Sequence, residues 1–241
     1  MGDAPGGRVI VAIPTLNEEQ SIGEVVRTLP RDKVSRVIVA DGGSTDTTAV
    51  QARNAGADVI SPGQGYGRAC LAATQAALDA DIIVFMDGDG ADDPANIAAL
   101  VAPIRAGAFD FVIGSRVRGQ RAPGSMAWHQ IAACLLAGLV MRMLYGVRYT
   151  DMCAFRAIRR DVLLSLGMRE LTYGWNVEMQ MRAARRGLRI LEVPVSCRRR
   201  IGGASKVAGN MRGTLRAGVR IVGTMVRVLS EKSAGNSTIK G

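Results

Sequence analysis

Histidine is nearly absent from the 241-residue chain, which has only His129, and the four cysteines are widely spaced without a CxxC pair. A structural zinc site needs four closely spaced Cys or His ligands, so a Cys/His zinc centre is excluded. Isolated cysteines are typical of proteins from reducing compartments, and we expect a reduced, cytoplasmic protein. The four cysteines are Cys70, Cys134, Cys153 and Cys197.

Long hydrophobic runs are also absent. The N-terminal residues MGDAPGGR lack the basic and apolar regions of a secretory signal peptide. The longest strongly apolar run, Ile131–Met141, has eleven residues, whereas a membrane-spanning helix needs about 20. We therefore expect neither a signal peptide nor a segment that crosses a bilayer.

Aromatic residues make up only 4% of the chain, but 48% hydrophobic and 22% charged residues are typical of a packed globular protein. The charge is distributed unevenly, since residues 1–110 carry 8 basic and 15 acidic side chains and residues 111–241 carry 23 and 6. The formal net charge of +10 therefore comes from the second half. We expect an acidic surface suited to a cation and a basic surface suited to phosphate or an anionic membrane.

In the first half, short apolar runs alternate with segments of helical periodicity. This alternation predicts an α/β fold with a mainly parallel sheet and helices on both faces. Pro94 suits the first turn of its helix. The predicted strands are Arg8–Ile13, Arg36–Ala40, Asp58–Ile60, Ile82–Met86 and Asp110–Ile113, and the predicted helices are Glu18–Leu29, Thr47–Asn54, Gly67–Leu78 and Pro94–Arg105.

The second half is mostly helical in pattern, and no repeat or low-complexity linker divides the chain. We expect one domain over residues 8–206, an amphipathic basic helix over 207–230, and flexible ends at 1–7 and 231–241. The other predicted helices are Ser125–Tyr145, Asp161–Leu166 and Trp175–Arg186, and the predicted strands are Cys153–Ile158 and Arg189–Val195.

On a helical wheel, the last predicted helix has a basic stripe and an apolar side. The apolar side either packs on the core and leaves the arginines in solvent, or lies on an anionic membrane surface. The sequence leaves both interpretations open. The basic stripe comprises Arg212, Arg216, Arg220 and Arg227, and the apolar side Met211, Leu215, Val219, Val222, Met225, Val226 and Leu229.

The string DGDG at residues 87–90 follows a predicted buried strand directly. In an open α/β sheet, ligands bind at the carboxyl ends of the strands, where this loop must lie. Asp87 and Asp89 can point together at Mg²⁺ or Mn²⁺, which prefer oxygen ligands and bridge carboxylates to phosphates. A calcium loop of EF-hand type would need Glu where Ala98 stands. A structural turn with solvated aspartates remains the alternative.

Two further polar loops close predicted strands at the same edge, PTLNEE at residues 14–19 and DGGSTD at 41–46. Their acceptor groups can hydrogen-bond a base and a ribose. Capping of the next helix by Ser44 or Thr45 is the alternative, but it does not account for Asp41. The glycine-rich segment Gly63–Arg68 opens a predicted helix, and its amides, at Gly67 and Arg68, can approach a phosphate.

These three loops, in this order, resemble the inverting family 2 glycosyltransferases of GT-A fold. The motifs downstream resemble those of the polyprenyl-phosphate sugar synthases of dolichyl-phosphate-mannose synthase type. The likeness covers roughly residues 8–206. The downstream motifs are Ile113–Arg116, Thr150-Asp151 with Ala154–Ala157, Gly174–Gln180, and Val193–Val195 with Arg200–Lys206.

The resemblance implies a GT-A, Rossmann-like domain that moves a hexose from a UDP- or GDP-sugar to polyprenyl phosphate. It implies Mg²⁺ or Mn²⁺ as cofactor and a peripheral position on the inner face of the cell membrane. Nucleic acid is not expected as a partner, and a homo-oligomer is left open. By resemblance, Pro14, Glu18 and Asp41 contact the nucleotide, Asp87 lies near ribose and diphosphate, and Asp89 binds the metal with Asp87. Arg116, Arg200, Ser205 and Lys206 handle phosphate, and Glu178 faces the acceptor, so that Asp89, Glu178, Arg116 and Arg200 are the candidate catalytic residues.

Three positions depart from the family pattern. Leu16 stands where a tyrosine is common, so base stacking is lost there. Ala91 replaces a glutamine that can help to bind metal, and Ala154 replaces the glycine before the FRA motif. We therefore expect differences in the donor pocket, the metal shell and the acceptor pocket.

The implied chemistry agrees with the residues present. A departing diphosphate needs a metal and cations, whereas an acceptor phosphate is already anionic and needs no strong base. Among Arg198–Arg200, strand alternation points only one or two side chains inward, and we favour Arg200 because the pattern Gly-x-Ser-Lys follows it. A soluble hydroxyl acceptor would instead need a base, for which Glu178 is the candidate. A nucleotidyltransferase and, from the basic half, a nucleic-acid-binding module are remoter alternatives.

Overall fold

The computed structural model describes residues 7–202 and 211–231, and for 211–217 it describes only the backbone. Within these residues, seven strands form one sheet in the order β3-β2-β1-β4-β6-β5-β7. Strand β6 is antiparallel to both of its neighbours, and the other pairs are parallel, which confirms the mainly parallel sheet. The strands are β1 (Val9–Thr15), β2 (Arg36–Asp41), β3 (Asp58–Ile60), β4 (Ile82–Phe85), β5 (Phe111–Ser115), β6 (Arg156–Arg159) and β7 (Ile190–Pro194).

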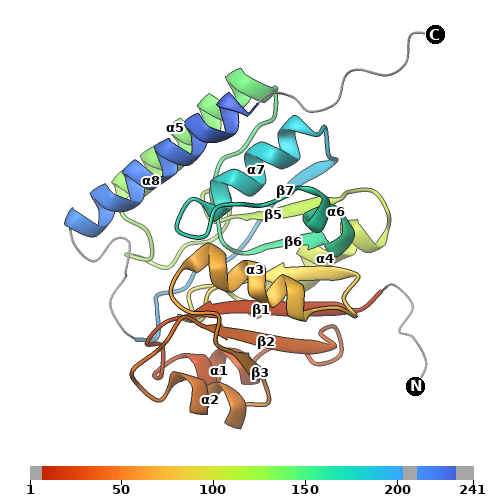
Figure 1. Cartoon of the computed structure of the whole chain (residues 1–241), viewed down its shortest axis with the longest axis vertical. Helices are drawn as coiled ribbons and strands as arrows, with labels where there is room; N and C mark the ends of the chain where they lie inside the picture. The colour runs from red at the N-terminus through yellow and green to blue at the C-terminus, as the bar shows by residue number, and fades with distance from the viewer. Residues whose placement is uncertain (1–6, 203–210, 232–241) are drawn as a thin grey trace.

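Helices cover both faces of the sheet, as predicted (Figure 1). Successive residues of β1 point to opposite faces, so Val11 joins one core cluster and Ile10 the other. Burial on both faces explains why the strands are continuous apolar runs in the sequence. Helices α1 (Ile22–Arg27), α2 (Thr48–Asn54) and α4 (Ile97–Arg105, after the 3₁₀ turn Pro94–Asn96) pack on the first cluster. Helices α3 (Tyr66–Ala76), α5 (Trp128–Tyr145), α6 (Arg160–Ser165), α7 (Trp175–Arg185) and α8 (Met211–Ser230) pack on the second.

Among the predicted elements that begin later than expected are β6 and α1. Strand β6 starts at Arg156 instead of Cys153, because the buried Arg156 guanidinium donates to the Cys153 carbonyl and closes a turn there. Helix α1 starts at Ile22 instead of Glu18. Asn17 has a φ of 51°, and the Glu18 carbonyl accepts hydrogen bonds from the amides of Ser21 and Ile22. The residues before α1 therefore form a turn at the edge of the sheet.

Helix α8 turns a different face to the core from the one that the helical wheel suggested. Its core face consists of Ile221, Thr224, Met225 and Val228, of which Thr224 and Val228 are buried. Four residues of the predicted apolar side are exposed instead, so the core-packing interpretation is wrong for them. They are Val219, Val222, Val226 and Leu229.

The predicted basic stripe of α8 is also corrected at one position. Arg227 does not face solvent freely, because its guanidinium lies 3.4 Å from Glu170 and 3.2 Å from Glu178. Arg220 is exposed. The side chains of Arg212 and Arg216 lie outside the described part of the chain.

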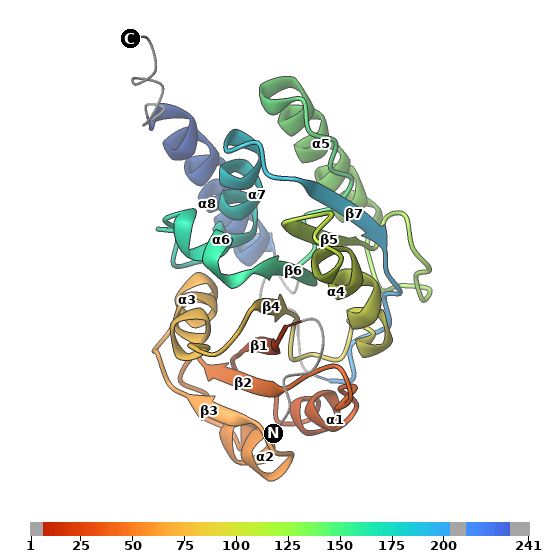
Figure 2. The same ribbon diagram turned by 90° about the vertical axis from the view of Figure 1, so that its right-hand side faces the viewer.

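Helix α5 has few buried residues, since only Gly138 and Met141 of its 18 residues are buried. Within the described residues it is the one helix long and apolar enough to cross a membrane, by length and composition. Length and composition alone do not show a span, so the expectation that no segment crosses a bilayer stays a prediction. Figure 2 shows α5 and α8 at the same end of the molecule, with α7 between them.

Candidate active site

The carboxyl ends of β1, β2 and β4 bring three predicted acidic loops to one edge of the sheet. Glu18 follows β1, Asp41 ends β2, and Asp87 and Asp89 follow β4. Glu18, Asp41 and Asp89 are all buried. The sequence therefore placed these four carboxylates correctly at a common edge, as the parallel pairing of β1 with β2 and β4 requires.

A third aspartate, Asp92, lies two residues after the DGDG string and holds the turn by a hydrogen bond. The amide of Asp87 donates to Asp92 Oδ2 at 3.0 Å, and the amide of Ala91 donates to Asp89 Oδ1 at 2.8 Å. Burial and the charge of Asp89 raise the pKa of Asp87 to about 6. Burial and the charge of Asp87 raise the pKa of Asp92 to about 8. Sequence reasoning missed Asp92, although its place three residues after Asp89 was a signal.

Arg200, the arginine favoured among Arg198–Arg200, lies across this acidic cluster. Its Nη2 is 3.0 Å from Glu18 Oε1 and its Nη1 is 3.0 Å from Asp89 Oδ2. Arg198 instead pairs with Asp93, and Arg199 donates to the Pro123 carbonyl. Arg200 therefore links Glu18, after β1, to the predicted metal ligand Asp89, after β4.

Arg116 is held at the other side of the cluster by Asp151. The fully buried Asp151 carboxylate accepts from the Arg116 amide at 2.9 Å, from Nε at 2.9 Å and from Nη2 at 2.8 Å. Burial opposes ionisation of Asp151, but the hydrogen bonds and charge of Arg116 outweigh it and lower the pKa of Asp151. The charge of Arg116 also works to lower the pKa values of Asp87 and Asp92. Asp151 stood in a quoted motif, but the sequence did not identify it as the partner of Arg116.

The loop after β2 is organised by Asp41. Its carboxylate accepts from the amide and the hydroxyl of Ser44. The Ser44 hydroxyl oxygen in turn accepts from the Asn17 amide at 2.8 Å, which joins this loop to the loop after β1. Helix α2 begins later, and Asp46 accepts from the Thr48 amide. The proposed capping of that helix by Ser44 or Thr45 is therefore wrong.

The glycine-rich segment has a packing role. A Cβ on Gly67 would lie 2.2 Å from the Glu170 carbonyl oxygen. The Arg68 amide already donates to the Leu171 carbonyl at 3.0 Å. The Arg68 amide is therefore engaged within the protein, which corrects its predicted contact with a phosphate, while the assignment of Gly67 to nucleotide binding stays a prediction.

Glu178 does not join the acidic cluster in the way that its predicted role requires. It has no exposed surface. Its Oε2 accepts from the amides of Arg169 and Glu170, at 3.0 and 2.7 Å, and its Oε1 accepts from Arg182 Nε at 2.9 Å. Arg227 adds a second cation at 3.2 Å. A base needs a free oxygen facing its substrate, so the geometry gives Glu178 a structural role.

Three predicted site residues remain, Pro14, Ser205 and Lys206. Pro14 is the penultimate residue of β1, beside the start of the first polar loop. Ser205 and Lys206 lie outside the described residues.

The DGDG turn offers two carboxylates to a divalent metal. In the described part of the chain, no group of three or more His, Cys, Asp or Glu side chains is arranged to hold one. Asp87 and Asp89 nevertheless suit Mg²⁺ or Mn²⁺, which are commonly bound through one or two carboxylates together with substrate phosphates and water. The mutual repulsion that raises the pKa of Asp87 is what such a cation would relieve.

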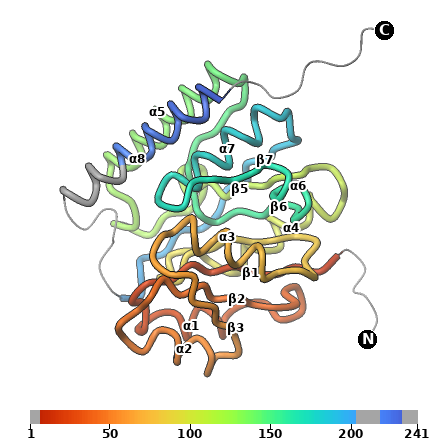
Figure 3. Tube along the Cα trace, viewed as in Figure 1, coloured from red at the N-terminus to blue at the C-terminus, as the bar shows by residue number. Residues whose placement is uncertain are grey.

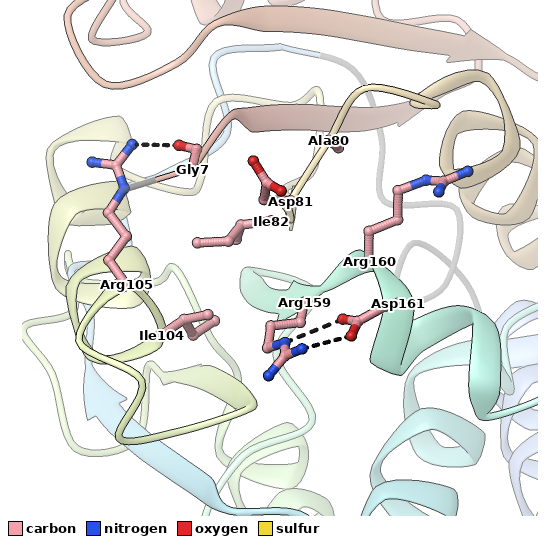
Figure 4. Close-up of a pocket in the computed structure, with 9 residues that line it drawn as sticks. All are labelled: Gly7, Ala80, Asp81, Ile82, Ile104, Arg105, Arg159, Arg160 and Asp161. Atoms are coloured by element: carbon pink, nitrogen blue, oxygen red, sulfur yellow. Dashed lines mark hydrogen bonds and ion pairs between the residues drawn. The ribbon is translucent and has the colours of Figure 1, made fainter. Parts of the chain in front are cut away.

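A cavity in the described part of the chain lies away from this site. It has a volume of about 500 Å³ and opens at the opposite edge of the sheet, beside Gly7 and Ile82. Figure 4 shows that Arg105 reaches the Gly7 carbonyl and that Arg159 pairs with Asp161. These arginines do not converge on a common point, and none of the predicted site residues lines the cavity.

Comparisons with known proteins agree on the class of enzyme. The family model "Glycosyl transferase family 2" matches residues 10–167. The chain is 36% identical over 213 residues to an uncharacterized glycosyltransferase of Mycobacterium tuberculosis, covering 87% of this chain and 94% of that protein. It is 34% identical to the undecaprenyl-phosphate mannosyltransferase of Micrococcus luteus, covering 86% and 90%. It is 30% identical to the polyprenol monophosphomannose synthase of Mycolicibacterium smegmatis, covering 86% and 83%.

Among solved structures, the fold is similar to that of glucosyl-3-phosphoglycerate synthase from Mycobacterium tuberculosis. One such structure contains Mn²⁺, uridine-diphosphate-glucose and phosphoglyceric acid. It has a TM-score of 0.74 and 26% sequence identity, and the match covers 92% of this chain and 80% of that chain.

Proposed function

This chain belongs to glycosyl transferase family 2 and is a glycosyltransferase of GT-A fold, and we propose that it transfers a hexose to polyprenyl phosphate. The donor is a UDP- or GDP-sugar, the cofactor is Mg²⁺ or Mn²⁺, and the transfer inverts the anomeric centre. The observation that carries the proposal is the acidic edge between two arginines, in which Glu18, Asp41 and Asp89 are buried and Asp87 is half-buried.

Each part of the site has a task in this reaction. Glu18 and Asp41 bind the base and ribose, while Asp87 and Asp89 would hold the metal. The metal, when bound, offsets the charge of the departing diphosphate. Arg116 and Arg200 add fixed positive charge beside it, and their acidic partners hold their guanidinium groups in place. The leaving group therefore departs as a nucleoside diphosphate whose charge is offset by the two arginines and, when bound, the metal.

The acceptor is argued from what the site contains. A phosphate acceptor is ionised at neutral pH and needs no general base. Glu178, the predicted base, is enclosed by its partners. Arg116 can orient an acceptor phosphate as well as the donor diphosphate. The names of two relatives, an undecaprenyl-phosphate mannosyltransferase and a polyprenol monophosphomannose synthase, support a polyprenyl phosphate.

We propose that helices α5 and α8 lie on the anionic inner face of the cell membrane. Both expose large apolar side chains at the same end of the molecule, among them Leu136, Met143 and Val222. The middle of α5 packs on the domain, where Gly138 meets the Tyr149 carbonyl and the Cys134 thiol lies 3.3 Å from Asp151. This packing favours a helix that lies on the surface over one that crosses the bilayer.

A soluble phosphorylated acceptor is the second candidate. The structural neighbour with uridine-diphosphate-glucose and phosphoglyceric acid supports it. Such an acceptor would use the same arginines, but its hydroxyl would need a base.

The experiment is nucleoside-diphosphate release from UDP- and GDP-sugars with Mn²⁺ or Mg²⁺. Each donor is tested alone, with short-chain polyprenyl phosphate, and with 3-phosphoglycerate. Asp89→Ala removes the predicted metal ligand, and Arg189→Ala serves as a control because it removes an exposed ion pair with Asp110. Release that needs polyprenyl phosphate and is lost only in Asp89→Ala supports the proposal. Release with 3-phosphoglycerate alone replaces it by the soluble acceptor.

A further inference from the structure

Arg227 joins α8 to α7 and to the loop before α7. Its Nη2 lies 3.4 Å from Glu170 Oε2 and its Nη1 lies 3.2 Å from Glu178 Oε1. Thr224, one turn earlier, donates its hydroxyl to Glu170 Oε2 at 3.0 Å. Glu178 is fully buried and also accepts from the amides of Arg169 and Glu170. The position of the loop 169–172 is therefore set by two carboxylates that Arg227 neutralises, Glu178 jointly with Arg182.

The loop 169–172 packs directly on the start of α3 (Figure 1). A Cβ on Gly65 would lie 2.5 Å from the Leu171 carbonyl oxygen, and one on Gly67 would lie 2.2 Å from that of Glu170. The Arg68 amide donates to the Leu171 carbonyl at 3.0 Å. Because backbone meets backbone here, a shift of the loop moves the start of α3 with it.

The residue between the two glycines, Tyr66, reaches the DGDG turn. Burial and the charge of Asp87 raise the pKa of Tyr66 well above its ordinary value, while a hydrogen bond with Asn176 works in the opposite direction. Hydrogen bonding from Tyr66 in turn works to lower the pKa of Asp87. The Tyr66 side chain is hydrogen-bonded to the Asp87 carboxylate. Trp175, the first residue of α7 after the loop, also packs edge-on against Phe85, two residues before Asp87, with ring centroids 6.3 Å apart.

Resting on the function proposed above, we propose that Arg227 is a positioning residue for the donor site. Through its two carboxylate partners, it fixes the loop 169–172 against the start of α3. The start of α3 then holds Tyr66 against Asp87. Loss of Arg227 loosens a donor-binding carboxylate that it does not touch.

Amide hydrogen exchange on the purified full chain, without substrate, tests this chain of contacts. Arg227→Ala is compared with Arg227→Lys, which keeps the charge, and with Arg189→Ala as the matched control. Arg189 also forms an ion pair with an acid, Asp110, but at the opposite edge of the sheet. In Arg227→Ala we expect exchange at least about tenfold faster in residues 65–70 and 86–91, with smaller increases in Arg227→Lys.

A role confined to anchoring α8 would speed exchange only in α8 and in the loop 169–172. That pattern, or equal exchange of residues 65–70 and 86–91 in Arg227→Ala and Arg189→Ala, overturns the proposal. If Arg227→Ala does not fold, the test rests on Arg227→Lys, in which faster amide exchange of residues 65–70 and 86–91 than in Arg189→Ala supports the proposal and equal exchange overturns it.

Turnover provides the second readout. Since Asp87 serves the donor, Arg227→Ala is expected to raise the KM for the nucleotide-sugar at least about fivefold and to leave the KM for the acceptor unchanged. Equal effects on both KM values overturn the positioning role. If the wild-type chain transfers no sugar to any acceptor, the proposed function fails, and the exchange measurement still decides the role of Arg227.

Discussion

The pair of Arg116 and Asp151 offers a quantitative test of how the site is held. Asp151 is fully buried and accepts three N–H groups of Arg116, at 2.8 to 2.9 Å. Removing one partner of a buried ion pair costs about 3–5 kcal/mol, because the other charge remains buried without compensation. The Arg116 side chain keeps 27% of its surface exposed. We therefore expect the lower end, about 3 kcal/mol, for Asp151→Asn.

A double-mutant cycle isolates the interaction. Arg116→Met and Asp151→Asn are measured singly and together by urea unfolding at pH 7. We expect a coupling free energy of about 2–3 kcal/mol. Arg189 and Asp110 form a bidentate pair of the same kind, at 2.6 and 3.0 Å, but the Arg189 side chain is 52% exposed. The matching cycle, Arg189→Met with Asp110→Asn, should give less than about 1 kcal/mol.

The pH dependence follows from the sign of the shift. The pKa of Asp151 is lowered in the folded protein, so the stabilisation is present above the ordinary value of about 3.9 and is lost as the pH falls below it. The advantage of the wild type over Asp151→Asn should therefore shrink below pH 4. Equal coupling in the two cycles, or a coupling below about 0.5 kcal/mol at Arg116, would refute the argument that burial makes this pair strong.

Three further predictions concern the turn, the glycine contact and the exposed helices. The pKa of Asp92 is raised to about 8, so the folded state binds its proton more tightly and the free energy of unfolding should fall as the pH rises from about 4 to 8. Asp92→Asn should flatten this fall by at least about 1 kcal/mol in thermal unfolding at pH 5 to 8. Gly67→Ala should cost about 1–3 kcal/mol, because its Cβ would overlap a carbonyl oxygen. Gly218→Ala, with open space in α8, should cost nothing. Val222→Asp and Met143→Asp, both at exposed positions, should abolish sedimentation with anionic liposomes and change stability by less than about 0.5 kcal/mol. Unchanged sedimentation would contradict the membrane surface.

Much of the site could be predicted because its residues follow strands in the sequence. Parallel strands carry their carboxyl ends to one edge, so the loops with Glu18, Asp41 and Asp87 had to meet. The Gly-x-Ser-Lys pattern after Arg200 also pointed to the arginine that pairs with Glu18 and Asp89. The mainly parallel sheet with helices on both faces followed from the apolar runs, since strands buried on both sides need apolar residues at every position.

What the sequence could not show are contacts between segments that are distant along the chain. Asp151 pairs with Arg116 across 35 residues, and Glu178 pairs with Arg227 of α8. The need for glycine at position 67 also depends on a distant segment. The sequence suggested a contact with phosphate, but the structure shows that a backbone carbonyl occupies the space of a Cβ there.

The sequence by itself determined the order of strands and helices, the acidic edge and the family, because these depend on local pattern and on residues next to strand ends. Only the tertiary structure decided which charges are neutralised inside the protein and which apolar faces stay exposed. A helical wheel gives the relative angles of side chains on α8 but not its rotation against α7. That rotation turned Arg227 toward two carboxylates and left Val219 and Val222 exposed.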